Sequence, residues 1–168
     1  MNYSFEDHLH NYAVWTAARA VQRSFVKTQV IKEAIESCTL QSVITSKKIK
    51  TAREFDEFHD DCCKKIISFF KKFGIETSYG RAAKIVSIYI KTAVVTRDSG
   101  KSILARVAHP PIDNLLLKNL KKDKKIKFSP APWTILDRKG YLRLIQELRK
   151  LQDDDFWKLE RYGVPVQG

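Results

Sequence analysis

The sequence predicts an all-α protein: a single compact domain over residues 1–168, with six to seven helices joined by short loops. Apolar residues recur at intervals of three and four along most of the chain, the spacing of a buried helix face. Only six glycines and five prolines are present, too few for the frequent turns of a many-stranded sandwich or barrel. Hydrophobic residues make up 43% of the chain, so a core can form without disulfides or a metal.

The first predicted helix begins at Ser4, whose hydroxyl pairs with Asp7 in a capping-box pattern, and it ends near Arg23 or Ser24. A second, shorter helix follows Thr28. The first helix carries an apolar stripe at helical spacing, which is expected to face the core: Phe5, Leu9, Tyr12, Ala13, Ala17, Ala20 and Val21.

The third predicted helix starts after Thr51, which forms a second capping box with Glu54. Residues 39–50, just before it, are less periodic and are expected to form a loop or a frayed turn. Gly74 supplies the left-handed residue that closes the helix. Seven residues make up its apolar stripe: Phe55, Phe58, Cys62, Ile66, Phe69, Phe70 and Phe73.

A fourth helix is predicted from about Ser78 to Thr96, in a central position because its apolar face is wide. Residues 97–108 after it are expected to form a loop, in which a turn of helix can lie. Proline suits the first turn of a helix, so a proline pair is expected to open the next one. The remaining predicted helices are one opened by Pro110 and Pro111, one over residues 137–151 and a short one that begins in residues 153–155.

Three cysteines, Cys38, Cys62 and Cys63, are expected to be free and buried, because an odd number with two adjacent cannot form a disulfide framework. Free thiols and the lack of a signal pattern point to the cytoplasm. No apolar run reaches the roughly 18 residues that span a bilayer, so no membrane partner is expected. No zinc-like ligand spacing and no glycine-rich phosphate loop is present, so neither a metal nor a cofactor is expected.

Positive charge dominates the composition, with 31 Lys and Arg against 19 Asp and Glu and a net charge of +12. Such a surplus attracts polyanions and predicts a nucleic-acid-binding protein. Two alternatives stay open: a non-catalytic interaction module that binds an acidic protein partner, and a charge surplus that serves solubility alone. The densest cluster of candidate phosphate contacts is Lys118, Lys121, Lys122, Lys124, Lys125 and Lys127, unless this is only a solvated loop.

A second basic feature is a line along the exposed side of the fourth helix, where Arg81, Lys84, Ile88 and Lys91 are three, four and three residues apart. Side chains at this spacing project from one face. Arg81 and Lys91 are therefore candidate phosphate contacts, although the line could equally be the solvated edge of the helix.

The string from Tyr79 to Lys84 and the string His109-Pro110-Pro111-Ile112-Asp113 resemble the catalytic half of the helix-hairpin-helix DNA glycosylase superfamily. The resemblance covers about residues 79–117. It implies DNA as the partner, Lys84 as the amine that attacks the sugar C1′ and forms a Schiff base, and Asp113 as the carboxylate that stabilises positive charge at the sugar. A simpler interpretation makes Asp113 an acid that stabilises a helix start.

Aromatic side chains supply further candidates. In a glycosylase-like enzyme, Trp15, Tyr89 or Trp133 could stack on a base that has left the helix, although each could equally be core packing. The sequence alone leaves open whether the protein is an enzyme.

Overall fold

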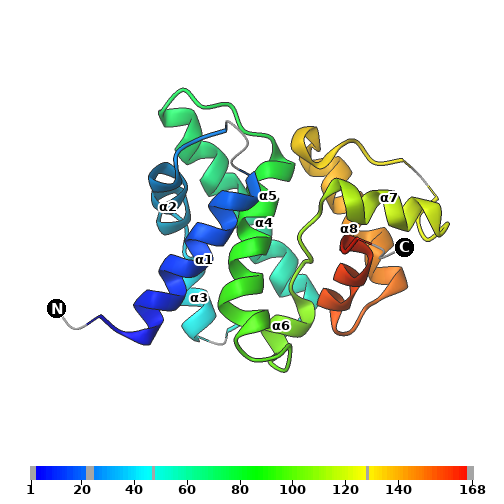
Figure 1. Cartoon of the computed structure of the whole chain (residues 1–168), viewed down its shortest axis with the longest axis horizontal. Helices are drawn as coiled ribbons and strands as arrows, with labels where there is room; N and C mark the ends of the chain where they lie inside the picture. The colour runs from blue at the N-terminus through cyan, green and yellow to red at the C-terminus, as the bar shows by residue number, and fades with distance from the viewer. Residues whose placement is uncertain (1–2, 22–24, 47, 128, 166–168) are drawn as a thin grey trace.

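The computed structural model of the chain describes residues 3–21, 25–46, 48–127 and 129–165 (Figure 1). The prediction of an all-α fold is confirmed: the described residues form helices and loops and no strand. They contain eight α-helices, slightly more than the six to seven expected. None of the described helices has both the length and the apolar character needed to cross a membrane.

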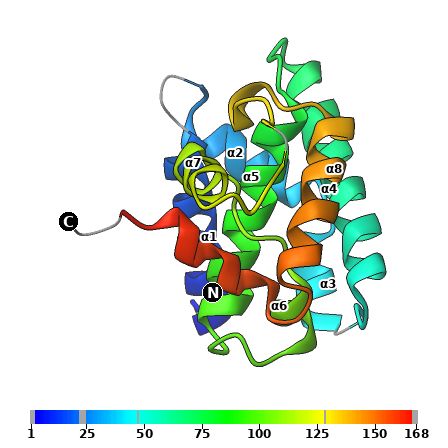
Figure 2. The same cartoon turned by 90° about the vertical axis from the view of Figure 1, so that its right-hand side faces the viewer.

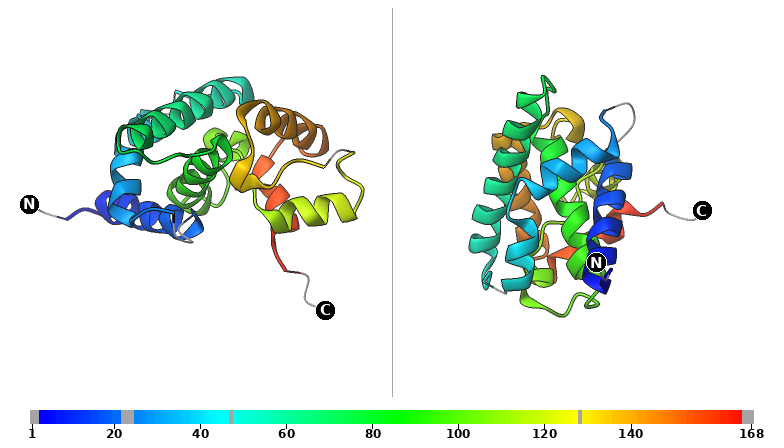
Figure 3. Two further views of the ribbon diagram at one scale, coloured as in Figure 1. Left: turned by 90° about the horizontal axis from the view of Figure 1, so that it is seen from above. Right: turned by 90° about the vertical axis from the view of Figure 1, so that its left-hand side faces the viewer.

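The central helix is α5 (Tyr79–Ile90), and every residue in it except Arg81 and Ile88 is buried. It continues without a break into a π-helical segment, Lys91–Thr96, so the predicted single element from Ser78 to Thr96 is confirmed. Seen from above, the other helices lie around α5 (Figure 3). Its central position means that side chains on α5 meet several other elements of the fold.

The N-terminal half consists of four helices: α1 (Phe5–Val21), α2 (Thr28–Glu36), α3 (Leu40–Ser46) and α4 (Ala52–Lys72). Helices α1 and α4 pack on α5, and α2 contacts α1, α3 and α4. Both predicted capping boxes are confirmed, at Ser4 with Asp7 and at Thr51 with Glu54. Gly74 closes α4 with a φ of 69°. The end predicted for the first helix, near Arg23 or Ser24, lies outside the described residues.

The prediction of a loop over residues 39–50 was wrong, because α3 occupies Leu40–Ser46. Leu40, Val43 and Ile44 have helical spacing, but Leu40 is the only fully buried residue of this helix and the apolar stripe is a single turn long, which is too short to stand out in the sequence. The hydroxyl groups of Ser42, Thr45 and Ser46 donate hydrogen bonds to backbone carbonyls three or four residues earlier. These local bonds satisfy polar side chains that favour turns when they are read from the sequence alone.

The prediction that Phe5 and Tyr12 face the core was also wrong, because their side chains are 66% and 53% exposed. The buried side of α1 consists of small residues: Ala13, Val14, Ala17, Ala18 and Val21. Small side chains let two helices approach closely, and the aromatic rings stay on the outward side. Apolar residues therefore lie on both sides of α1, and their period does not show which side is buried.

The C-terminal half consists of α6 (Ile103–Val107), α7 (Asn114–Lys122), a 3₁₀ turn (Trp133–Ile135), α8 (Arg138–Leu151) and a 3₁₀ helix (Phe156–Gly163). The prediction that the proline pair opens a helix was wrong. Pro110 and Pro111 lie in an extended segment, and α7 begins after Asp113, whose carboxylate accepts a hydrogen bond from the amide of Leu116 at 2.8 Å. A proline disfavours helical backbone geometry in the residue before it. The two prolines therefore keep this segment extended up to the Asp113 cap.

A buried polar network joins this extended segment to α4 and to α8, which lies beside α4 (Figure 2). The Asp56 carboxylate accepts hydrogen bonds from His109 Nε2 at 2.8 Å and from Arg149 Nη2 at 2.6 Å. The other His109 nitrogen accepts from the Tyr141 hydroxyl at 3.1 Å, and this hydroxyl lies 3.4 Å from His59 Nε2. The network fixes His109, four residues before Asp113.

The same network predicts a loss of stability in mild acid. Burial lowers the pKa of His59, and burial also lowers the pKa of His109, although Asp56 opposes the second shift. Both rings therefore stay neutral in the folded protein, while in the unfolded chain they bind protons below a pH of about 6.5. We expect the free energy of unfolding to fall by about 2 kcal/mol between about pH 7.5 and pH 5.5. Urea denaturation at both pH values tests this, and equal stability would contradict it.

Candidate nucleic-acid interface

Six lysines form the basic segment, at the end of α7 and in the loop that follows it: Lys118, Lys121, Lys122, Lys124, Lys125 and Lys127. All six are exposed. The opposite side of α7 packs into the core through Leu116, Leu117 and Leu120. Lys121 and Lys122 lie in the last turn of the helix, where the helix dipole favours positive charge.

Within the described part of the chain, no lysine of the basic segment forms an ion pair, and Lys121 donates a hydrogen bond to the Ser129 hydroxyl at 2.8 Å. Some lysines elsewhere are ion-paired, although exposed Lys71, Lys72 and Lys101 are not, within the described residues. Lys64 lies 2.6 Å from Asp60, and Lys65 lies 2.8 Å from Asp61. The positive charge of the basic segment is therefore available to an external anion.

Helix α8 adds a second row of cations that we did not predict. Lys139, Arg143 and Lys150 are exposed and are four and seven residues apart, so they share one face. The pKa of Glu147 on this helix is lowered by a hydrogen bond from Lys150 and by the charges of Arg143 and Lys127. Lys127 of the basic segment therefore lies close to the α8 row. The spacing of these residues on a predicted helix was visible in the sequence.

The basic line predicted along α5 is not an exposed stripe. Arg81 places its guanidinium 4.7 Å from the centre of the Phe25 ring. Lys91 forms an ion pair with Glu160 of the C-terminal 3₁₀ helix. Lys84 is only 8% exposed, so the prediction that it lies on a solvent-facing line was wrong. Each of these three cations is directed at a partner within the protein.

The structure brings the two residues of the predicted catalytic pair together. Lys84 Nζ on α5 lies 3.8 Å from Asp113 Oδ2 at the start of α7, and 4.5 Å from the centre of the Trp133 ring. Burial lowers the pKa of Lys84, and the nearby Asp113 carboxylate opposes this shift. The pair thus combines a poorly solvated amine with a carboxylate that also caps a helix.

Gly80 allows the turn that carries Trp133 to approach α5. A Cβ atom on Gly80 would lie 2.0 Å from the Trp133 carbonyl oxygen, which is far inside contact distance. The Gly80 amide also donates a hydrogen bond to the Leu136 carbonyl at 2.8 Å. This amide is therefore used within the fold, and the glycine positions Trp133 over Lys84.

The three aromatic candidates lie in different surroundings. Tyr89 is 1% exposed, and its hydroxyl hydrogen-bonds to His10 Nδ1 at 2.8 Å, so it belongs to the core. Trp133 packs against Lys84. Trp15 lies on the outward side of α1 and is 51% exposed. Of the three candidates, it is the one most exposed to solvent.

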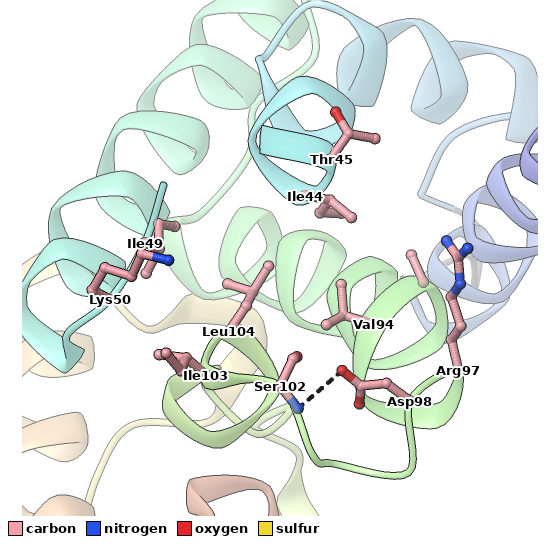
Figure 4. A pocket seen from close by; sticks show the side chains of 11 residues that line it. Ile44, Thr45, Ile49, Lys50, Val94, Arg97, Asp98, Ser102, Ile103 and Leu104 are labelled. Carbon is pink, nitrogen blue, oxygen red and sulfur yellow. Dashed lines mark hydrogen bonds between the residues drawn. The ribbon is translucent and has the colours of Figure 1, made fainter. Parts of the chain in front are cut away.

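A separate, mostly apolar cavity of about 410 Å³ lies between α3, the π-helical segment and α6 (Figure 4). Ile44, Val94 and Leu104 line it. The two charged side chains that border it from the π-helix side already have partners: Arg97 binds Glu6, and Asp98 accepts a hydrogen bond from the amide of Ser102 at 3.1 Å. None of the predicted site residues lines this cavity.

Comparison with known proteins identifies no relative: no protein-family model, no curated protein and no solved structure matches the chain.

Proposed function

We propose that this protein binds nucleic acid, DNA in particular, and that the basic segment makes the main contacts with phosphate groups. One observation carries the proposal: six exposed lysines within ten residues, none ion-paired in the described structure, on a chain with a net charge of +12. The α8 row lies close to the segment at Lys127, and Lys150 of the row is ion-paired with Glu147.

Lysine contacts of this kind favour the backbone over the bases. A lysine ammonium is a flexible point charge that can follow a phosphate, whereas base recognition requires a fixed array of donors. Each neutralised phosphate releases condensed counterions and steepens the dependence of log affinity on log salt by about 0.9 on duplex DNA. We therefore expect binding with little sequence preference and a strong dependence on salt.

Neutralising part of the basic segment tests this proposal. We expect the fourfold Lys→Gln variant at positions 121, 122, 124 and 125 to bind a fluorescent duplex about tenfold or more weakly at low salt, with a shallower salt slope. Fluorescence anisotropy measures both quantities. The matched control replaces four other exposed lysines without ion pairs in the described structure: Lys48, Lys71, Lys72 and Lys101.

The control variant loses the same amount of positive charge, but at positions outside the basic segment. If the phosphate contacts are localised in the segment, this variant keeps most of its affinity. Equal losses in the two variants would show that the net charge acts without a localised site. Undetectable binding by the wild-type protein at low salt would remove the proposal and leave an acidic protein partner as the function to test.

A second candidate function, that of a DNA glycosylase or lyase, is favoured by the Lys84–Asp113 pair. A lysine amine attacks a sugar carbon only when it is unprotonated, and burial shifts Lys84 in this direction. The amine would form a bond to C1′ of an abasic sugar and lose water to give an imine. Asp113, 3.8 Å away, would stabilise the positive charge that develops.

Borohydride trapping on abasic DNA tests the second candidate. We expect the wild-type protein to be trapped covalently on the DNA, and Lys84→Met, which keeps much of the side-chain volume, to give no adduct. Circular dichroism establishes that the variant is folded. An adduct of equal yield in both proteins, or none in the wild type, would remove the chemistry without affecting the binding proposal.

A further inference from the structure

The outward side of α1 carries the aromatic row: Phe5, Tyr12 and Trp15, with Arg19 at its end. The three aromatic side chains are 66%, 53% and 51% exposed. Their positions are seven and three residues apart, so they lie on one face of the helix. Exposed aromatic side chains that gather on one face of a helix can mark a binding site.

The rings of the aromatic row are arranged for stacking. The Tyr12 and Trp15 rings are nearly parallel, with an interplanar angle of 17° and centroids 6.0 Å apart. The Arg19 guanidinium lies 5.9 Å from the Trp15 ring, and the Arg97 guanidinium lies 5.8 Å from the Phe5 ring. Both distances fall within cation–π range. The row therefore offers flat aromatic faces next to positive charges.

The acidic residues nearest to the row are already bonded within the protein. Glu6 forms an ion pair with Arg97, and the Asp7 carboxylate accepts hydrogen bonds from Ser4. Hydrogen bonds leave the negative charge of Asp7 in place, but the charge that lies beside the Trp15 ring is the positive one of Arg19, which is exposed and has no ion pair among the described residues. This charge favours a polyanion as the occupant and disfavours a second copy of a chain that itself carries +12.

We propose that the aromatic row is a stacking platform for unpaired bases of single-stranded nucleic acid. This inference rests on the proposed function, since it assigns the form of nucleic acid that this face accepts. Bases in a duplex already stack on one another, whereas unpaired bases can stack on aromatic side chains with little dependence on sequence. Arg19 is positioned to contact the phosphate that links two stacked bases.

The aromatic row and the basic segment lie in different parts of the molecule. In the view from above, α1 and α7 lie along one edge of the molecule, and α4 and α8 lie along the opposite edge (Figure 3). Helix α1 and the end of α7 lie towards opposite ends of the long axis of the molecule (Figure 1), so one strand would have to cross much of its length to contact both the aromatic row and the basic segment.

The test compares single-stranded oligothymidine with a short duplex. We expect the double variant Tyr12→Ala/Trp15→Ala to bind oligothymidine about tenfold or more weakly and the duplex within about twofold of wild type. Stacking on Trp15 also quenches its fluorescence, so the quenching that oligothymidine causes should be reduced in the variant. Phe73→Ala is the control, because it removes a ring that is 60% exposed just after the end of α4, and it should change neither affinity.

The outcomes separate the two proposals. A wild-type protein that binds neither oligonucleotide would overturn both. If the wild type binds both and the double variant keeps its full affinity for oligothymidine, only the stacking platform is overturned. If ultracentrifugation shows a dimer that the double variant abolishes, the row is an interface between copies, which also overturns the platform.

Discussion

Replacing Gly80 with alanine is expected to destabilise the protein by about 3 kcal/mol or more, the upper end of the range for overpacked sites. The added Cβ atom would lie 2.0 Å from the Trp133 carbonyl oxygen, and this oxygen belongs to the backbone and cannot rotate away. Either α5 or the Trp133 turn must move, and the hydrogen bond from the Gly80 amide to Leu136 must lengthen or break.

Urea denaturation measures the loss of stability in Gly80→Ala, and Gly163→Ala is the matched control. A Cβ atom on Gly163 would make only ordinary contacts, the nearest at 3.8 Å with Leu116, so this variant should stay within about 1 kcal/mol of wild type. The ring of Trp133 packs on Lys84, so Gly80→Ala should also change the tryptophan emission. Equal stability of the two variants would contradict the close approach of this turn to α5.

Replacing Asp56 with alanine is expected to destabilise the protein by about 2–3 kcal/mol, somewhat less than the value for a fully buried pair because a third of the side chain is exposed. The change removes the acceptor of both His109 and Arg149. The Arg149 side chain is 13% exposed and His109 is 3% exposed, so neither can recover its hydrogen bond from bulk water.

The control for Asp56→Ala is Asp61→Ala on the same helix. Asp61 is 53% exposed and pairs with Lys65 on the surface, so its loss should cost less than about 1 kcal/mol. Thermal or urea denaturation separates the two variants. If both lose the same small amount, the buried network does not hold α4, α8 and the 108–113 segment together.

The helices that the sequence predicts well are those with both a local start signal and a one-sided apolar stripe. In α4, Thr51 and Glu54 define the start and Gly74 defines the end, and the predicted stripe identifies the buried side, although Phe73 at its end is 60% exposed. In α1 the start is equally clear, but apolar residues lie on two sides. The choice between small and aromatic faces depends on how closely α5 approaches, and the local sequence contains no information on this distance.

In the candidate site, too, the sequence shows which residues are present but not which partners they meet in the fold. The six lysines of the basic segment are visible in the sequence, whereas their lack of acidic partners depends on how the whole chain folds. The partners of Asp56 lie 53 and 93 residues away in the sequence, so no local pattern indicates that network. The Lys84–Asp113 pair was predicted only through the family resemblance, and its burial against Trp133 was not predicted.

The most direct test of a localised phosphate contact is footprinting of lysines with an amine-reactive reagent, read by mass spectrometry, with and without duplex DNA. We predict that DNA protects the lysines between Lys118 and Lys127, and that it leaves Lys71 and Lys72 at the end of α4 as reactive as in the free protein. Protection spread evenly over all exposed lysines, or confined to lysines outside the basic segment, would contradict the account.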